Sequence, residues 1–227
     1  MQLIEIFKSL QGESSYAGLP CVFVRLAGCN LRCVWCDSEY TFKGGYRLTL
    51  DEVMQEVQRL SPRAGLVEIT GGEPLLQERE VVPLMERLLS SGYKVMVETS
   101  GERPLDRIPA AVVKIVDVKC PDSGEGDTFR EENLPFLTAS DELKFVIASR
   151  RDYEFAREFI RQHTLSARVG SVILSPAFRK DATGSRDVSH CLLDPQTLAE
   201  WMLADELNAR LGLQIHKFIW DPAMKGV

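Results

Sequence analysis

Short runs rich in β-branched residues alternate along this chain with longer amphipathic segments, and this alternation restricts the fold more than any other feature. Strands separated by helices form βαβ units and a parallel sheet. The fold class predicted is therefore α/β, as a partial, open parallel β/α barrel with about six core strands. Strands are expected at residues 21–26, 66–70, 94–99, 113–118, 143–147 and 171–174, and helices at 50–60, 78–89, 151–162 and 195–211.

The two ends of the chain are expected to add to this barrel. The N-terminal residues precede its first strand, and the final run from Leu213 to Trp220 is interpreted as a seventh strand or as a tail that folds back over the barrel mouth. With 227 residues and no internal repeat or linker, we expect residues 1–227 to form one domain.

Polar and glycine-rich sequences follow nearly every expected strand. Because catalytic groups of parallel barrels lie at the carboxyl ends of the strands, these segments are predicted to meet at one rim. They are Gly28 to Cys36, Gly71 to Pro74, Ser100 to Glu102, Lys119 to Pro121, and Ser175 with Pro176.

Composition and charge exclude several classes of protein. The formal charge of −6 argues against direct binding of nucleic acid, and no segment is apolar enough for a membrane span. The N-terminus lacks the features of a secretory signal, which predicts a cytoplasmic protein. Six cysteines in such a chain, three of them in one loop, favour metal binding over disulfides.

The three clustered cysteines, Cys29, Cys33 and Cys36, form a C-x3-C-x2-C motif after the first core strand. Structural zinc sites and ordinary four-iron clusters have four protein ligands, so three thiolates leave one metal position open. The alternative is a structural zinc ion whose fourth ligand comes from elsewhere in the chain, although the spacing differs from that of the usual zinc motifs. The candidates for that fourth ligand are Cys21, Cys120, Cys191 and His190.

A second motif, Gly71-Gly72-Glu73-Pro74, follows the next strand. Glycines allow a backbone to approach a ligand closely, and the adjacent carboxylate can receive a cationic amino group. An ordinary turn with a surface carboxylate is the plain alternative.

Together these two motifs resemble those of the radical S-adenosylmethionine (SAM) superfamily. The resemblance implies a [4Fe–4S] cluster on Cys29, Cys33 and Cys36, with SAM chelating the fourth iron and yielding a 5′-deoxyadenosyl radical on reduction. It also implies cofactor contacts for a set of residues on the same rim: Trp35, Gly72, Glu73, Asp117, Val118, Lys119, Ser175, Pro176 and Ala177.

Further segments narrow the resemblance to the 7-carboxy-7-deazaguanine synthase family. They are Glu5 to Glu13, Arg25 to Cys29, Asp37 to Tyr40, and Gln214 to Lys217, so the likeness covers nearly the whole chain. Two residues depart from the family pattern: Ser14 replaces a glycine and Ser38 replaces a threonine. Both substitutes are small, and serine keeps the hydroxyl.

The family resemblance implies a substrate, 6-carboxy-5,6,7,8-tetrahydropterin, and a Mg²⁺ ion bound at Ser38. Arg25 shares a strand face with Phe23 and Cys21, so its guanidinium needs an anionic partner inside the barrel. The substrate carboxylate is one candidate, and an internal Asp or Glu is the other. The substrate-binding residues implied are Leu10, Gln11, Gly12, Glu13, Arg25, Thr70, His216 and Val227.

Two other functions are consistent with parts of the sequence. A radical SAM activase, which places a glycyl radical on a partner protein, shares the first two motifs, whereas a zinc-stabilised binding module would need only the cysteines. The synthase interpretation implies a flavodoxin- or ferredoxin-type reductant and a homodimer, both carried over from the family. It implies no nucleic-acid or membrane partner.

Overall fold

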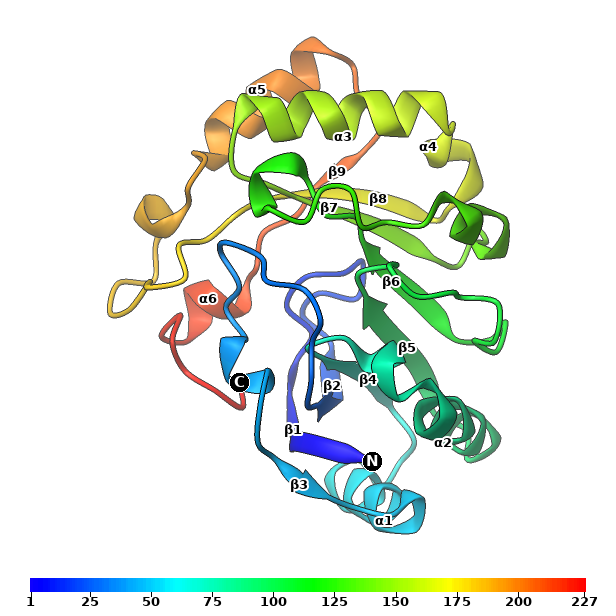
Figure 1. Cartoon of the computed structure of the whole chain (residues 1–227). Coiled ribbons are helices and arrows are strands. Elements are labelled where there is room, and N and C mark those ends of the chain that lie inside the picture. The colour runs from blue at the N-terminus through cyan, green and yellow to red at the C-terminus, as the bar shows by residue number, and fades with distance from the viewer.

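The computed structural model describes residues 1–227 and contains one continuous sheet of nine strands (Figure 1). The six expected core strands are all present, within one or two residues of the predicted bounds. The strands are β1 (Gln2–Leu10), β2 (Pro20–Leu26), β3 (Tyr46–Arg47), β4 (Leu66–Gly71), β5 (Lys94–Thr99), β6 (Val113–Asp117), β7 (Glu142–Ile147), β8 (Ser171–Pro176) and β9 (Arg210–Leu211).

The strand order is β3-β1-β2-β4-β5-β6-β7-β8-β9, and neighbours from β2 to β9 pair in parallel. Strand β1 pairs antiparallel with β2 and β3, as the arm of a hairpin that precedes the parallel units. The sheet curves strongly, but β3 and β9 remain as its two edges. The predicted open α/β barrel is confirmed, with additions at both ends.

The helices lie mainly on the outer side of the curved sheet (Figure 1). They are α1 (Leu50–Leu60), α2 (Glu78–Ser90), α3 (Arg150–Gln162), α4 (Leu165–Arg168), α5 (Pro195–Ala204) and α6 (His216–Ile219). Helix α1 begins with a capping box in which Thr49 and Glu52 each bind the other's backbone N–H, as their spacing predicts. Short 3₁₀ turns occupy Glu39–Thr41, Pro74–Gln77, Pro121–Ser123, Glu131–Phe136 and Val188–His190. None of the helices combines the length and the hydropathy that a membrane span requires.

The predicted end of the last long helix was wrong, and so was the strand, which was one of the two interpretations of the run from Leu213 to Trp220. The helix expected over residues 195–211 ends at Ala204, because Glu206 adopts a left-handed conformation with φ of 47° and the chain then pairs with β8 as β9. The run from Leu213 to Trp220 is not a strand. The Ile215 N–H bonds to the carbonyl of Gly12 instead of to a sheet neighbour, and helix α6 follows.

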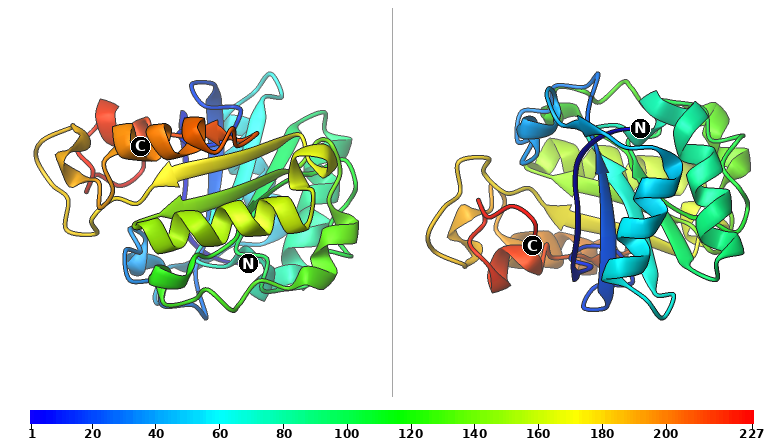
Figure 2. Two further views of the ribbon diagram at one scale, coloured as in Figure 1. Left: turned by 90° about the horizontal axis from the view of Figure 1, so that it is seen from above. Right: turned by 90° about the horizontal axis from the view of Figure 1, so that it is seen from below.

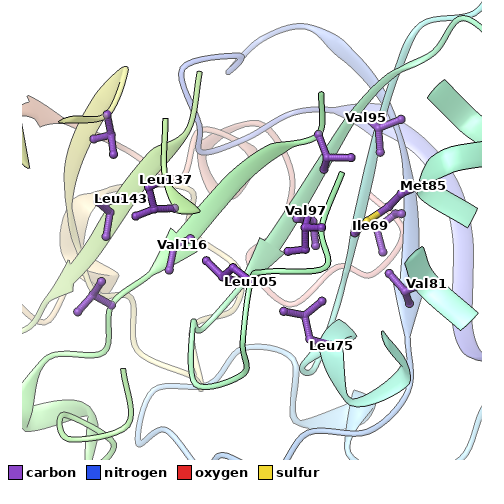
Figure 3. Close-up of a cluster of buried hydrophobic side chains, with 14 of the residues drawn as sticks. Ile69, Leu75, Val81, Met85, Val95, Val97, Leu105, Val116, Leu137 and Leu143 are labelled. Atoms are coloured by element: carbon purple, nitrogen blue, oxygen red, sulfur yellow. The ribbon is translucent and has the colours of Figure 1, made fainter. Parts of the chain in front are cut away.

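The two faces of the parallel sheet differ in character because side chains alternate along each strand. On the helix-covered face, Ile69, Val97 and Val116 belong to a core cluster of 37 buried residues (Figure 3). The residues that alternate with them face the inside of the barrel. Near its amino-terminal end these include Phe23, Met96 and Ile115. Charged side chains occupy that inner face nearer the carboxyl ends.

One ion pair is buried outside the barrel interior, and it generates a test of the fold. Lys114 and Asp141 are 2% and 0% exposed, and the Lys114 Nζ lies 3.0 Å from the Asp141 carboxylate. Removing one partner of a buried pair leaves an uncompensated charge, which typically costs about 3–5 kcal/mol. We expect Lys114→Met to lower the free energy of unfolding by about that amount in urea titrations. The control is Arg150→Met, which removes an exposed pair with Glu154 and should change it by less than about 1 kcal/mol.

Candidate active site

A cavity of about 410 Å³ opens at the carboxyl ends of the parallel strands. Every site residue implied by the sequence lines it except Val118, Ser175, Pro176 and Ala177. Those four are buried outside the cavity lining, and Val118 belongs to the core beneath the helices. The structure therefore brings the two motifs and the hairpin residues together, but not these four side chains.

The cysteine loop crosses one side of the cavity, and all three thiols are free and partly buried. The loop is fixed by backbone contacts, since Val34 N–H donates to the Ser123 carbonyl and Cys36 N–H to that of Cys33. Burial raises the pKa of the Cys33 thiol to about 11, against the lowering effect of Lys119. The thiols are therefore protonated without metal, and binding iron releases their protons.

The arrangement of these sulfurs fits a cluster better than a single ion. No three side chains of His, Cys, Asp or Glu converge closely enough to hold one metal ion. A structural zinc ion requires its ligands within about 2.3 Å of one centre, whereas each thiolate of an iron–sulfur cluster binds a different iron. The structure therefore gives the zinc interpretation no support, and three thiols on one loop are the donor set that a [4Fe–4S] cluster with one open iron would use.

The Gly71-Gly72 turn packs directly against this loop. A Cβ atom at Gly72 would lie 2.4 Å from the Gly28 carbonyl oxygen and 2.6 Å from the Cys29 Cβ. The Glu73 N–H donates to that same carbonyl over 2.9 Å. Glycine at position 72 is therefore required by the close approach of the two loops.

The Glu73 side chain differs from its expected open carboxylate. It is 1% exposed and accepts four hydrogen bonds, from Leu75 N–H, Thr99 Oγ1, Ser100 N–H and Ser100 Oγ. A carboxylate offers about four acceptor positions, so all are in use. Burial nevertheless raises its pKa. In this state, Glu73 ties the loop after β4 to the end of β5.

Arg25 points into the cavity and has an internal partner. Its Nε lies 2.9 Å from Glu5 Oε1, an oxygen that also accepts from the Tyr40 hydroxyl. The guanidinium stands over Phe7, which stacks on Phe23. Of the two partners left open by the sequence, the internal carboxylate is the one present here.

The hairpin between β1 and β2 extends across the inside of the barrel. Gln11 hydrogen bonds to Glu68 on β4, and Glu13 pairs with Lys144 on β7 at 2.7 Å. Burial raises the pKa of Glu13, but the charge and hydrogen bond of Lys144 together with the charge of His216 outweigh this and lower it to about 2. The second Glu13 oxygen accepts from Gln214, in the C-terminal region.

The C-terminal tail closes the other side of the cavity. Lys217 is 5% exposed and bonds to Asp37 at 2.7 Å, while Ser38 Oγ donates to that same aspartate. The His216 ring lies against Gly12, where an added Cβ would be 2.1 Å from Nδ1. Gly184 and Arg186 of the loop after β8 bond to this tail, and the two segments lie side by side in both views of Figure 2. The interpretation of the tail as a cover is thus supported.

Three inward-facing charged residues were not predicted from the sequence. Glu68, Glu98 and Lys144 lie on β4, β5 and β7 and all line the cavity. Glu68 and Lys144 each interrupt apolar residues in a largely buried strand, and Glu98 ends the apolar run of β5. That interruption is the signal that could have identified them, since a charge in such a strand requires a partner.

The contact at Gly72 gives a test of the site's construction. In Gly72→Ala, the added methyl must displace Gly28 or Cys29, which disturbs the cysteine loop. Because changes next to metal ligands cost about 10- to 100-fold in affinity, we expect iron to be lost at chelator concentrations about tenfold lower than for the unsubstituted protein. The measurement is iron and sulfide per chain after anaerobic reconstitution.

A matched control is Gly65→Ala, where the nearest obstacle is the flexible Ser61 hydroxyl. If Gly72→Ala retains iron as well as this control does, the close contact has no role in holding the loop.

Comparisons with known proteins agree with this site. The radical SAM superfamily pattern matches residues 24–120. The 7-carboxy-7-deazaguanine synthase of Koribacter versatilis is 70% identical over all of both chains, and that of Chlorobaculum tepidum is 40% identical over 100% of this chain and 97% of its own. The crystal structure of QueE from Escherichia coli superposes with a TM-score of 0.72 at 24% identity, covering 93% of this chain and 92% of its own, which supports the fold. This chain belongs to the 7-carboxy-7-deazaguanine synthase family of radical SAM enzymes.

Proposed function

We propose that this protein converts 6-carboxy-5,6,7,8-tetrahydropterin into 7-carboxy-7-deazaguanine and ammonia by a SAM-dependent radical ring contraction, a step in 7-deazapurine (queuosine) biosynthesis. One observation carries the proposal. The cysteine loop, the Gly72 turn and the residues Gln11, Glu13 and Arg25 all line one cavity. Its volume of about 410 Å³ lies in the range of small-molecule sites, which favours a pterin over the protein loop of an activase substrate.

The cofactor assignment follows from the donor set. Cys29, Cys33 and Cys36 would hold the [4Fe–4S] cluster, and the backbone at Gly72 would approach the methionine end of SAM. The bound cluster supplies the electron that cleaves SAM. Trp35, Asp117 and Lys119 border the same part of the cavity and are proposed cofactor contacts. Glu73 would contribute by fixing the Gly72 backbone, because its oxygens already have partners.

The substrate would occupy the remainder of the cavity. Arg25 would exchange Glu5 for the substrate carboxylate, which is an anion of the same geometry. Glu13, Gln11 and the Thr70 hydroxyl offer hydrogen-bonding groups for the pterin edge. His216 and Val227 of the C-terminal tail would exclude water from the cavity, together with Leu10 and Gly12 of the first hairpin.

A Mg²⁺ ion is proposed at Ser38, which faces the cavity beside Asp37. Mg²⁺ keeps several waters and needs few protein ligands, so one hydroxyl with substrate oxygens suffices. The Lys217 ammonium pairs with Asp37 at 2.7 Å and would compete with the ion for that carboxylate.

The wider setting is proposed on the same basis. We propose one domain over residues 1–227, supported by the continuous sheet, and a homodimer carried over from the family resemblance. The reductant would be a flavodoxin or ferredoxin, as the low potential of such clusters requires. A cytoplasmic location is consistent with six free cysteines, and the charge of −6 disfavours nucleic acid.

The direct test is an anaerobic assay of reconstituted protein with carboxytetrahydropterin, SAM, dithionite and Mg²⁺. We expect 7-carboxy-7-deazaguanine and ammonia in equal amounts, identified by mass and ultraviolet spectrum. Reductive SAM cleavage without any deazaguanine would leave a radical SAM enzyme with a different substrate, and the proposed reaction would be rejected.

The Mg²⁺ assignment has its own test at Ser38. In Ser38→Ala the ion loses its only side-chain ligand in the proposal, so we expect the Mg²⁺ concentration for half-maximal turnover to rise about tenfold. Ser38→Thr, which restores the residue usual in the family, is the control and should retain the original dependence. An alanine variant with unchanged rate and unchanged Mg²⁺ dependence would remove Ser38 from the site.

A further inference from the structure

Lys144 is a buried cation in the cavity wall that the proposed reaction does not yet use. It is 3% exposed and lies on β7 between Leu143 and Phe145, which both point to the opposite, helix-covered face. Its ammonium is therefore directed into the barrel interior. A lysine buried to this degree is rare without partners, because its charge would otherwise be desolvated.

Three carboxylates from three different elements meet this one ammonium. The Lys144 Nζ lies 2.7 Å from Glu13 Oε2 and 2.5 Å from Glu98 Oε1, and 3.7 Å from Asp117 Oδ2. Glu13 belongs to the β1–β2 hairpin, Glu98 to β5 and Asp117 to β6. Lys144 is thus the common partner that sets where these side chains stand relative to one another.

Each carboxylate has a second partner that fixes its orientation. Glu13 Oε1 accepts from Gln214, Glu98 Oε2 accepts from the Thr70 hydroxyl, and Asp117 also pairs with Lys119. For Glu13 and Glu98, an ammonium on one oxygen and a second donor on the other hold the carboxylate in one place. Asp117 differs, because both lysines contact its Oδ2. Such preorganisation lowers the cost of ordering a site when a ligand binds.

The protonation of the carboxylates around Lys144 depends on its ammonium. Without Lys144, the carboxylates of Glu13, Glu98 and Asp117 would lie close together. The remaining lysine in contact with them would be Lys119, which pairs with Asp117. Glu68 faces the same space, and burial followed by the charge of Glu98 raises its pKa well above the usual range. Neighbouring carboxylates that lose a shared cation take up protons, since like charges in a buried site cannot all stay ionised.

We propose that Lys144 is a positioning residue that holds Glu13 and Glu98 in place as acceptors for the N–H-rich edge of the pterin, and that keeps Glu13 ionised. The inference rests on the proposed function for the nature of that ligand. An ionised carboxylate only accepts hydrogen bonds, whereas a protonated one presents a donor. A protonated Glu13 would therefore face the ring donors with a donor of its own, and affinity would fall.

The test uses 6-carboxypterin, an unreactive pterin that keeps the ring amino group and the carboxylate. Its binding to reconstituted protein is measured through its own fluorescence, so the result does not depend on turnover. We expect Lys144→Met to weaken this binding about 10- to 100-fold, and Lys144→Arg to recover most of it. The matched control is Lys94→Met on the same sheet, where the exposed lysine stacks on Tyr16 and should leave affinity unchanged.

The pH dependence separates positioning from simple loss of structure. The charged or titratable groups that line the cavity around Lys144 are Glu13, Glu68, Glu98, Asp117, Lys119 and His216. In the unsubstituted protein the pKa of Glu13 is about 2, so Glu13 is ionised throughout and should add no pH dependence to the affinity between about pH 6 and 7. In Lys144→Met the affinity for 6-carboxypterin should fall as the pH drops, because carboxylates without the lysine ammonium bind protons.

A charge-balanced variant covers the case in which Lys144→Met does not fold. Lys144→Met combined with Glu98→Gln removes one positive and one negative charge, so the cavity keeps its net charge. We expect this double variant to fold, by circular dichroism and iron content, and to bind 6-carboxypterin at least about fivefold more weakly than Glu98→Gln alone, because Glu13 has lost its anchor.

Three results overturn the proposal. The first is a folded, iron-loaded Lys144→Met that binds 6-carboxypterin within about twofold of the unsubstituted protein, and the second is a double variant equal to Glu98→Gln. The third is an unsubstituted protein that does not bind the probe, because the pterin edge is then not what Lys144 prepares the site for. Failure of the proposed function is visible separately, as an unsubstituted protein that binds the probe but forms no deazaguanine.

Discussion

The two-residue alternation of side chains along buried parallel strands is the constraint on which this structure depends. Every second residue faces the helices, and these positions are filled by Ile69, Val97, Val116 and their neighbours in the core. The other positions face inward and are free to carry charge, provided that each charge meets a partner across the barrel. One sheet can thereby supply both the stability of the fold and the polar wall of the cavity.

Much of the fold was predictable because strands and helices repeat local patterns. The six core strands, helix α1 and its cap at Thr49 follow from periodicity and short-range chemistry. The C-terminal region was not predictable in this way. Leu213 to Trp220 has the apolar content of a strand, but the contact of Ile215 with Gly12 is a long-range interaction that no local pattern encodes. The partner of a backbone N–H depends on the whole fold.

The site was predictable where residues occur in compact motifs, as for Cys29 to Cys36 and Gly72. It was not predictable where the function of a residue depends on its partner. Glu73 was expected to be open to a ligand and is instead saturated, and Arg25 already has Glu5. Lys144 gave only a weak signal, because a single charge in a strand does not reveal which three carboxylates lie opposite. Geometry rather than residue type assigns these partners.

The crossing of the barrel by the first hairpin has a consequence for how the cavity forms. The contact of Glu13 with Lys144 spans 131 residues of sequence, and its contact with Gln214 spans 201. Contacts so distant in sequence close large loops, which costs chain entropy. The contacts that fix the cysteine loop, such as Val34 with Ser123, lie within the first part of the chain. The reactive end of this cavity therefore needs only the first few parallel units, whereas the end that would select the substrate joins the beginning of the chain to its last residues.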